Sequence, residues 1–395
     1  MAEIISHIYQ DKTGHWVIQS NENHSAGVAK LASQFAGEFG MSEWGKVLGL
    51  LHDKGKETDT FQQYIKKESG YDPDIKICGK HHHAYVGGIL AQKYYGKSSC
   101  NFFVNQIVSH HTGLHDSDEI KGIIDQEIPS EVNIYHIKEK LNRPELNVQA
   151  NDFHHLARML FSCLVDADFL DTEAFMDKES SALRQNKDTL NGLLPLLENK
   201  LKDLKAKADC SEVNIIRNQI QQQCIEMADT PTGFYSLTVP TGGGKTLSSL
   251  VWAIKHAIKN GQKRVIIAIP YTSIIVQTAS VLRSIFGEEN VLEHHSCVDQ
   301  EQIKDEKLKE KMKLATENWG YPIIVTTNVQ LFESMFSNKP SACRKLHNIV
   351  NSVIILDEVQ TLPMDYLQPI VDSLKTYNKL FTMYPSCSQL QVSPC

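Results

Sequence analysis

The stretch LLHDKGK, residues 50–56, decides how the first half of the chain is interpreted. It places His52 and Asp53 side by side at the end of the apolar run WGKVLGLL. Neighbouring residues on a helix point in different directions, so two ionisable side chains cannot share one flat packing face there. A helix end at which polar groups meet water would explain the pair by itself. A functional pair would instead require partners from other segments of the chain.

The composition is that of a globular protein with reduced cysteines. The chain has 395 residues, of which 41% are hydrophobic and 22% charged, and this length allows two or three domains. No apolar stretch approaches the roughly 20 residues of a membrane span, and no secretory signal is visible. The nine cysteines include no C-x-x-C pair, which favours a cytoplasmic protein without disulfides or a zinc ribbon. With a net charge of −7, any nucleic-acid contact must use local basic patches.

Hydrophobic periodicity divides the chain into regions of different type. Residues 20–175 have a helical pattern, and the first expected helix carries an apolar stripe of Val28, Leu31, Ala32, Phe35 and Phe39. From residue 235, the β-branched runs FYSLTV, RVIIAI, PIIVTT and SVIILDE alternate with helical stretches, which is typical of a parallel sheet covered by helices. The sequence therefore predicts an all-α domain over residues 1–176, a helical linker over 177–230 and an α/β domain over 231–395.

Histidine and aspartate side chains near the other expected helix ends are candidate partners for His52 and Asp53. A metal site needs several such ligands from different segments. The candidate set comprises His24, His52, Asp53, His83, His110, His111 and Asp168. This set is large enough for two ions that share a bridging group, an arrangement suited to phosphodiester hydrolysis. Each residue taken alone would more often be a polar group at a helix end. His81 or His82 competes with His83, and Asp166 with Asp168.

The order H…HD…H…HH…D, with HDKGK and LVDADFLDTE, resembles the HD superfamily of metal phosphohydrolases. More narrowly, it is similar to the HD nuclease domain of the CRISPR-associated nuclease–helicases of type I interference systems. The resemblance implies that the candidate set ligates metal, that His52 and Asp53 are catalytic, and that Lys56 lies near a substrate phosphate. It favours His83 through the pattern H-A-x-x-G-G, and Asp168 through the order Ala-Asp-aromatic-Leu. A His-rich site suits two Mn²⁺, Fe²⁺, Co²⁺ or Ni²⁺ ions better than Mg²⁺.

A phosphate-binding loop is indicated by SLTVPTGGGKTLSSL, residues 236–250. Backbone N–H groups of a tight glycine-rich loop can approach phosphate oxygens closely. Lys245 would then reach the terminal phosphates of ATP, and the Thr246 hydroxyl would bind Mg²⁺. The expected nucleotide-binding residues of the loop are Thr241, Gly242, Gly243, Gly244, Lys245 and Thr246.

The run SVIILDEVQ, residues 352–360, supplies the second half of a nucleotide site. Its strand ends at Asp357 and Glu358, at the sheet edge where ligands bind in such folds. Asp357 would hold Mg²⁺, and Glu358 would position or deprotonate the attacking water. The intervening segments 268–279 and 323–336 resemble superfamily 2 helicase segments that contact a nucleic-acid strand. The residues expected to reach backbone phosphates are Thr326, Thr327 and Asn328.

Together the resemblances imply a metal-dependent nuclease for single-stranded DNA, fused to an ATP-binding RecA-like helicase lobe and recruited by an RNA-guided CRISPR surveillance complex. The chain ends about 35 residues after DEVQ, and its tail FTMYPSCSQLQVSPC lacks a strand pattern. We therefore expect a lobe that is incomplete at its C-terminus, through truncation, a frameshift or a split gene, and no helicase activity from this chain alone. A separate chain would supply the second lobe. The alternatives are an HD-type nucleotide phosphohydrolase and a non-catalytic ATP-binding docking subunit.

Overall fold

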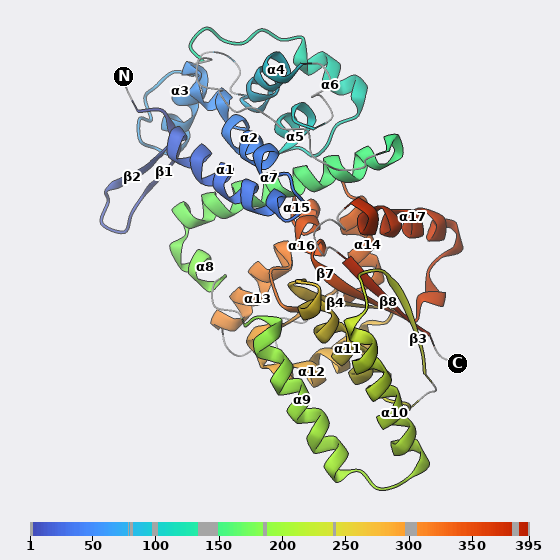
Figure 1. Ribbon diagram of the computed structural model, residues 1–395. Helices are drawn as coiled ribbons and strands as arrows, with labels where there is room; N and C mark the ends of the chain where they lie inside the picture. The colour runs from blue at the N-terminus through green and yellow to red at the C-terminus, as the bar shows by residue number, and fades with distance from the viewer. Residues whose placement is uncertain are drawn as a thin grey trace. The chain divides into compact units, whose positions relative to one another are not determined.

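The computed structural model describes residues 3–77, 79, 82–96, 102–132, 149–184, 188–239, 242–296, 306–380 and 387–393 (Figure 1). It divides into two compact units. Unit 1 contains Met1–Ala182 and Ser337–His347, and unit 2 contains Leu183–Phe336 and Asn348–Cys395. The domain limits expected at residues 176 and 230 stay predictions. In the described ranges, no helix combines the length and apolar character that crossing a membrane requires.

Unit 1 is the predicted helical domain, preceded by an antiparallel hairpin of two strands. The hairpin and the first helices are β1 Ile5–Gln10, β2 Trp16–Ser20, α1 Asn21–Gly37, α2 Ser42–Leu51, the 3₁₀ turn η1 Lys54–Glu57, and α3 Asp59–Glu68. The later helices are α4 Ala84–Tyr95, α5 Val104–Ser109, α6 Ser117–Ile124, α7 Phe153–Met176, α8 Lys178–Leu183, α15 Pro340–Cys343 and α16 Leu346–Ile349.

Helix α1 is stabilised by a side-chain cap at its start and by an apolar stripe along its buried face. The Ser20 side chain accepts a hydrogen bond from the Asn23 N–H and so satisfies one of the free donors at the helix start. Val28 and Ala32 from the predicted stripe are fully buried, and Figure 1 shows α1 lying along α7. Leu160 and Leu164 of α7 are equally buried. The two helices therefore form the frame on which the polar residues of unit 1 are placed.

Residues 337–347 belong to unit 1 although they lie between two elements of unit 2 in the sequence. Arg344 Nε donates to Asp166 Oδ1 on α7 over 2.8 Å, and both side chains are buried. The His347 N–H donates to the Ser162 hydroxyl over 3.0 Å, and its ring stacks on Phe35. This insertion was not foreseen from the sequence.

Unit 2 is built on a parallel sheet with the strand order β3-β8-β7-β4-β6-β5. Its strands are β3 Phe234–Thr238, β4 Arg264–Ile269, β5 Val291–His294, β6 Ile323–Thr327, β7 Ser352–Asp357 and β8 Cys387–Ser393. Its helices are α9 Leu190–Lys207, α10 Glu212–Glu226, α11 Lys245–Lys259, α12 Thr272–Phe286, α13 Glu306–Asn318, α14 Asn328–Phe336 and α17 Met364–Leu380. The predicted parallel α/β lobe is confirmed.

The expectation that the C-terminal tail holds no strand is wrong. Strand β8 pairs in parallel with β7 on one side and with β3 on the other, so the edge beside β7 is not left open. The pairing uses backbone groups, and a strand held between two neighbours needs no long apolar run of its own. The alternation of Leu390 and Val392 with glutamine and serine is compatible with that position.

The segment expected to be a helical linker contributes to the core of unit 2. Leu193 and Leu197 of α9 are fully buried in the cluster that also holds Leu250 of α11 and Ile267 of β4. The leucines of this part of the expected linker therefore form the apolar stripe of a helix packed on this lobe.

Candidate metal centre and nucleotide site

Helix ends bring the candidate metal ligands together. His52 follows the last residue of α2, His83 precedes the first residue of α4, and His110 follows the last residue of α5. Gly55 allows the close approach of these segments, since a Cβ there would lie 2.0 Å from the His83 carbonyl oxygen. The ends of three helices therefore bring these histidines close together.

The first group of candidate ligands combines His24, His52, Asp53 and Asp168. His24 Nε2 lies 3.2 Å from Asp53 Oδ2 and 3.3 Å from Asp168 Oδ1. His52 Nε2 lies 3.2 Å from the same Asp53 oxygen and 3.3 Å from His24 Nε2. Two imidazoles and two carboxylates thus face one small volume.

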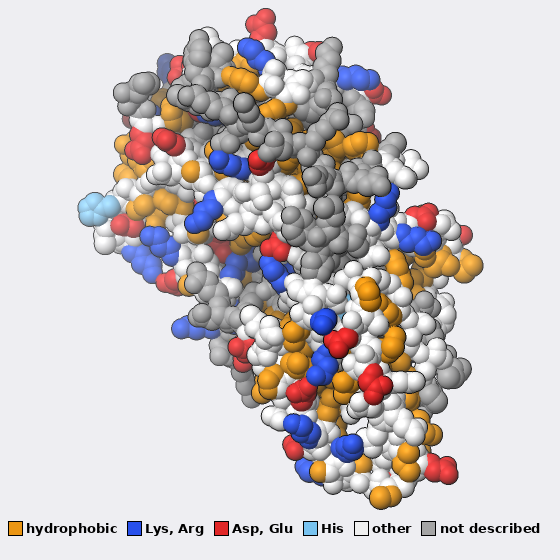
Figure 2. All heavy atoms as spheres, in the orientation of Figure 1, with side chains coloured by type: hydrophobic (Ala, Val, Ile, Leu, Met, Phe, Trp, Pro, Cys, Tyr) orange, Lys and Arg blue, Asp and Glu red, His pale blue; other side chains and the backbone are white. Residues whose placement is uncertain are grey.

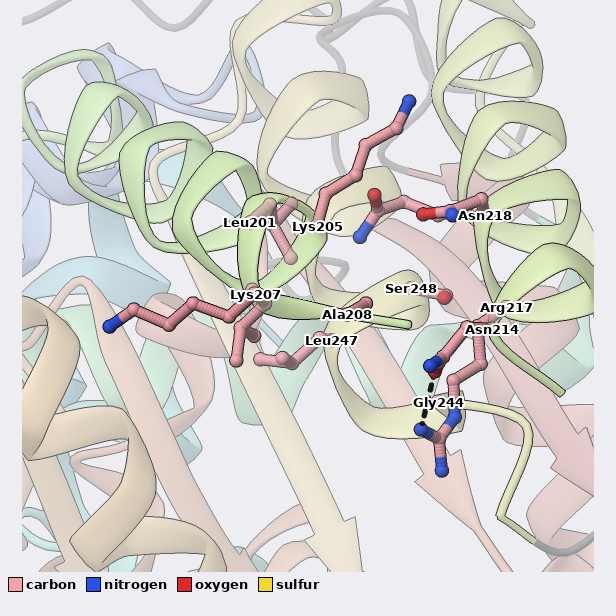
Figure 3. Close-up of a pocket in the computed structure, with 12 residues that line it drawn as sticks. Leu201, Lys205, Lys207, Ala208, Asn214, Arg217, Asn218, Gly244, Leu247 and Ser248 are labelled. Atoms are coloured by element: carbon pink, nitrogen blue, oxygen red, sulfur yellow. Dashed lines mark hydrogen bonds between the residues drawn. The ribbon is translucent and has the colours of Figure 1, made fainter. Parts of the chain in front are cut away.

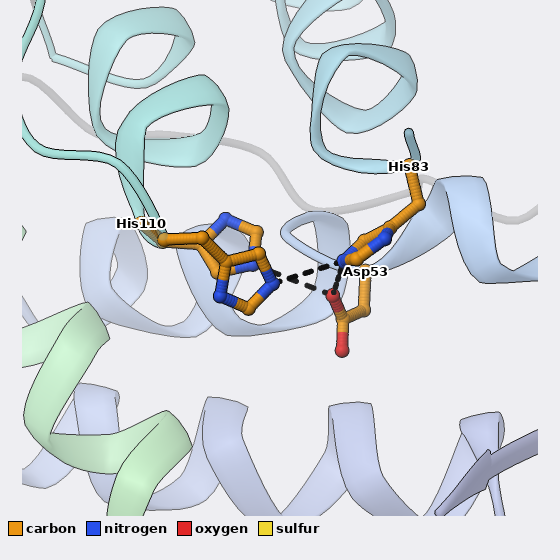
Figure 4. A group of neighbouring side chains, drawn as sticks. Asp53, His83 and His110 are labelled. Atoms are coloured by element: carbon orange, nitrogen blue, oxygen red, sulfur yellow. Dashed lines mark hydrogen bonds and ion pairs between the residues drawn. The ribbon is translucent and has the colours of Figure 1, made fainter. Parts of the chain in front are cut away.

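The second group combines Asp53, His83, His110 and His111 (Figure 4). Asp53 Oδ1 lies 3.3 Å from His83 Nε2 and 3.5 Å from His110 Nε2, and His111 Nε2 lies 3.0 Å from His83 Nε2. Asp53 therefore presents Oδ2 to the first group and Oδ1 to the second. All the residues of the candidate set are brought together, and their role as ligands stays a prediction.

Neighbouring carboxylates, which accept hydrogen bonds from the rings, raise the pKa values of the histidines in the first group. Burial lowers the pKa of His24, but hydrogen bonds with Asp168, Asp171 and Asp53 outweigh it and raise the pKa to about 10. Burial also opposes the charged form of His52, whose pKa Asp53 and Asp168 raise to about 9. Without a metal ion, protonated imidazoles therefore supply the positive charge that balances the carboxylates.

The two carboxylates of the first group stay ionised in spite of their burial. Burial would raise the pKa of Asp53, but the charges of His52 and Lys56 hold it well below its usual range. Burial likewise opposes ionisation of Asp168, whose pKa is held well below its usual range by hydrogen bonds with His24 and His52. A divalent cation needs buried negative charge beside its imidazole ligands, and these two carboxylates can supply it.

The residues fit a divalent metal ion. Asp53 Oδ1 and His110 Nε2 are buried, lie 3.5 Å apart, and have no hydrogen-bond partner among the residues that the structure describes, which leaves two ligand atoms available on one side of Asp53. The donor set of imidazole nitrogens and carboxylate oxygens suits Mn²⁺, Fe²⁺, Co²⁺ and Ni²⁺. Figure 2 shows few histidine side chains on the face in view, in keeping with the burial of His24 and His52.

The position of Lys56 on η1 places its ammonium group beside the candidate metal centre. Its Nζ lies 2.7 Å from Asp53 Oδ2, 3.1 Å from Ser6 Oγ and 3.3 Å from His7 Nε2. His7 on β1 was missed by the sequence analysis. Burial, together with the neighbouring Lys56 and His24, lowers the pKa of His7 to about 3, so its ring is neutral. His7 is half-buried on β1, and a single histidine at such a position of a strand gives no periodic signal that marks it as part of a site.

The competing residues that the sequence left open have different surroundings in the structure. Asp166 is fully buried and forms an ion pair with Arg344, whereas Asp168 faces the first group. His82 is exposed and His83 belongs to the second group. His81 lies outside the described residues.

The phosphate loop precedes α11, as predicted. Gly242 and Gly244 adopt the left-handed φ values of 81° and 79°, which residues with a Cβ rarely occupy. Lys245 Nζ lies 2.6 Å from Asp357 Oδ1 and 2.8 Å from Glu358 Oε1. The lysine and the two acids expected to bind ATP and Mg²⁺ are therefore in direct contact.

The other nucleotide-binding residues are placed as follows. Gly243 is buried, the Thr246 side chain is exposed at the start of α11, and Thr241 lies outside the described residues. Thr326 is fully buried and its hydroxyl donates to the His294 carbonyl over 2.8 Å, so it does not present that hydroxyl to a nucleic-acid strand.

A pocket of about 450 Å³ adjoins the phosphate loop (Figure 3). Its lining includes Lys205, Arg217, Asn218, Gln221, Gly244 and Ser248. Arg217 Nε donates to the Gly242 carbonyl over 2.7 Å and thereby fastens the loop to α10. Arg217 was not singled out from the sequence, because α10 was interpreted as part of a linker.

The family comparisons match both halves of the chain. A model for the HD domain matches residues 21–148, and a model for the DEAD/DEAH box helicase matches residues 218–387. The putative CRISPR-associated nuclease/helicase Cas3 of Methanocaldococcus jannaschii is 32% identical over 164 residues, which are 38% of this chain and 22% of that protein.

Solved structures show the same fold at low sequence identity. T. fusca Cas3 superposes with a TM-score of 0.61 at 14% identity over 99% of this chain, and its AMPPNP form with a TM-score of 0.60 at 15% identity over 98%. A chain from a CRISPR RNA-guided surveillance complex in the pre-nicking state matches with a TM-score of 0.54 at 15% identity over 100% of this chain. The present chain spans 50%, 50% and 48% of those chains, respectively, and less than a quarter of the curated relative named above.

The fold and the two sites define a fusion of an HD domain with the nucleotide-binding lobe of a DEAD-box helicase. The chain is similar to Cas3 in fold over 99% of its length, and to a putative Cas3 nuclease/helicase in sequence over 38% of its length.

Proposed function

We propose that the chain is a metal-dependent nuclease that cuts single-stranded DNA in CRISPR interference. The observation that carries the proposal is the position of Asp53, whose two carboxylate oxygens face two separate groups of imidazoles. A single-ion nucleotide phosphohydrolase would need only one of these groups. The pair of groups therefore favours a two-ion nuclease over that alternative.

In the proposed reaction, His24, His52, Asp53 and Asp168 hold one ion, and Asp53, His83, His110 and His111 hold the other. Bound there, two divalent ions would activate a water molecule and offset the charge that develops on the phosphodiester. Lys56 is the buried cation nearest the shared carboxylate, and we assign it to a phosphate oxygen of the substrate.

Unit 2 is proposed to bind ATP with Mg²⁺. Lys245 would exchange Asp357 and Glu358 for the terminal phosphates, which frees Asp357 for Mg²⁺ and Glu358 for the attacking water. The pocket beside Gly244 would receive the nucleoside, since its asparagine and glutamine amides can both donate and accept hydrogen bonds. The AMPPNP-bound form of the T. fusca relative supports this assignment.

The proposed setting is the cytoplasm, where the chain would act with an RNA-guided surveillance complex. The match to a chain of such a complex supports this partner. The test is capture of the purified chain by an assembled surveillance complex on target DNA, compared with the same complex on DNA without a target. Equal capture in both cases would contradict the proposal.

The nuclease assignment is tested by digestion of labelled single-stranded DNA with Mn²⁺, Co²⁺ or Ni²⁺ and without ATP. The Asp53→Ala variant should reduce cutting to background, because it removes a ligand of both ions. The Asp118→Asn variant, an exposed change on α6, is the matched control. Undiminished cutting by Asp53→Ala would contradict the assignment, and hydrolysis of free nucleotides but not of DNA would favour the phosphohydrolase.

A further inference from the structure

Asp171 lies one helical turn after Asp168 on α7 and has no role in the assignments above. Its Oδ2 lies 2.8 Å from His24 Nδ1, the ring nitrogen that points away from the candidate metal volume. The Gln19 amide donates to the same oxygen over 2.9 Å. Residues three apart on a helix share a face, so Asp168 and Asp171 approach His24 together.

The three buried histidines around Asp53 differ in how their Nδ1 atoms are held. His52 Nδ1 lies 2.8 Å from the Gly49 carbonyl oxygen, and His110 Nδ1 lies 2.5 Å from the Ile107 carbonyl oxygen. Both histidines follow the end of a helix, where the last carbonyl groups have no partner within the helix. His24 lies in the first turns of α1, where the carbonyl groups are taken up by the helix itself. It therefore needs an acceptor from another element, and Asp171 is that acceptor.

Space for the Asp171 carboxylate is made by Gly27 on α1. A Cβ at this position would lie 1.9 Å from Asp171 Oδ1 and 2.8 Å from its Cγ. Glycine in a helix interior is unfavourable compared with alanine, so its presence here agrees with a need for room. Gln19, Gly27 and Asp171 thus form a support on the side of His24 opposite the metal volume.

We propose that Asp171 is a positioning residue for the metal centre, through His24. The inference rests on the proposed function, because it requires a metal ion at the first group. When Nδ1–H donates to Asp171, the Nε2 lone pair of His24 is the one available to the ion. Partners of this kind fix the tautomer and ring orientation of a metal-binding histidine, and losing one typically reduces metal affinity by about 10-fold to 100-fold.

The first test is the Asp171→Asn variant of the whole chain, titrated with Mn²⁺ by isothermal calorimetry. An asparagine amide can donate to Nδ1, which would place the proton on Nε2 and block the metal-binding nitrogen. We expect affinity at one of two sites to fall by about 10-fold to 100-fold while the other is retained. The visible absorption of bound Co²⁺ should change for one ion only. Asp118→Asn removes the same charge on α6 and should change neither signal.

The second test is Gly27→Ala, which leaves Asp171 chemically intact but removes its space. Alanine favours the helix, but its Cβ displaces the Asp171 carboxylate, so the metal-free protein should melt lower than wild type and only the Mn²⁺ site that contains His24 should weaken. Gly122→Ala on α6 is the matched control, because a Cβ there meets nothing within 4 Å.

The outcomes separate this inference from the proposed function. Wild-type protein that binds no Mn²⁺, Co²⁺ or Ni²⁺ would overturn both. Two ions bound with unchanged affinity by Asp171→Asn and by Gly27→Ala would overturn the role of Asp171 alone. Equal weakening of both ions in these variants would show that Asp171 supports the fold and not His24.

Discussion

Replacing Arg344 with methionine should destabilise unit 1 strongly. Arg344 and Asp166 form an ion pair in which the side chains are 6% and 0% exposed, and the guanidinium also lies 4.5 Å from the Phe169 ring centroid. Removing the cation leaves a buried carboxylate beside His347, whose Nε2 lies 3.4 Å from Asp166 Oδ2. Breaking a buried pair from one side costs about 3–5 kcal/mol. The cost is large because Asp166 cannot recover its hydration at that position.

For a unit of this size, about 1 kcal/mol shifts the melting temperature by about 2–4 °C, so the expected loss is about 6–20 °C. The assay is thermal unfolding of the whole chain followed by circular dichroism. Lys121→Met is the control, since it breaks an exposed pair with Asp118 that is worth at most about 1 kcal/mol. The double variant Arg344→Met with Asp166→Leu should recover most of the loss, because it removes both charges together.

A loss below about 1 kcal/mol for Arg344→Met would refute this reasoning, because the pair would then behave like a solvated surface pair. A double variant no more stable than Arg344→Met would show that the loss comes from packing and not from the orphaned charge.

Further changes have expected outcomes at the nucleotide site and in the pH profile. Lys245→Ala should weaken ATP binding measured by calorimetry and leave metal-dependent cutting of single strands intact; parallel losses would contradict independent sites. Arg217→Ala should lower ATP affinity by about 2-fold to 10-fold, the value of one hydrogen bond to the loop, and an unchanged affinity would exclude that contribution. In the folded protein the pKa values of His24 and His52 are about 10 and about 9, whereas in the unfolded chain a histidine has a pKa of about 6.5. Metal-free protein should therefore lose stability as the pH rises from about 6.5 to 10, and a melting temperature that rises over this range would contradict the pKa shifts.

Several residues of the candidate metal centre could be singled out because they adjoin helix ends, which the sequence marks well. His52, His83 and His110 adjoin helix termini, where neighbouring segments can approach closely. The choice between Asp166 and Asp168 could not be made on physical grounds, since residues two apart on a helix point to opposite sides and either side could face the metal. Arg344, the partner of Asp166, lies 178 residues further along the chain. Asp171 could have been identified from the sequence, because it follows Asp168 by three residues and therefore lies on the same face of the helix.

Sequence patterns also gave incomplete predictions where packing between distant segments determines the role of a helix or strand. Helix α9 is charged and leucine-spaced, which suits a solvated connection as well as a helix covering a sheet. Only the position of Leu193 and Leu197 against α11 and β4 distinguishes the two. The fold class of unit 2 was predictable, because buried parallel strands form apolar runs that alternate with helices. Strand β8 departs from that pattern and was missed for that reason.

Both candidate sites compensate their charges internally, and this affects how each would bind its ligand. The carboxylates of Asp53 and Asp168 are balanced by imidazolium groups, and those of Asp357 and Glu358 by Lys245. A divalent ion at the first site must displace protons, so its affinity should rise with pH while the imidazoles titrate. At the second site a nucleotide must displace carboxylates from Lys245, and those freed carboxylates repel phosphate unless Mg²⁺ accompanies it. Ligand binding is therefore an exchange of partners at both sites, governed by protons at one and by Mg²⁺ at the other.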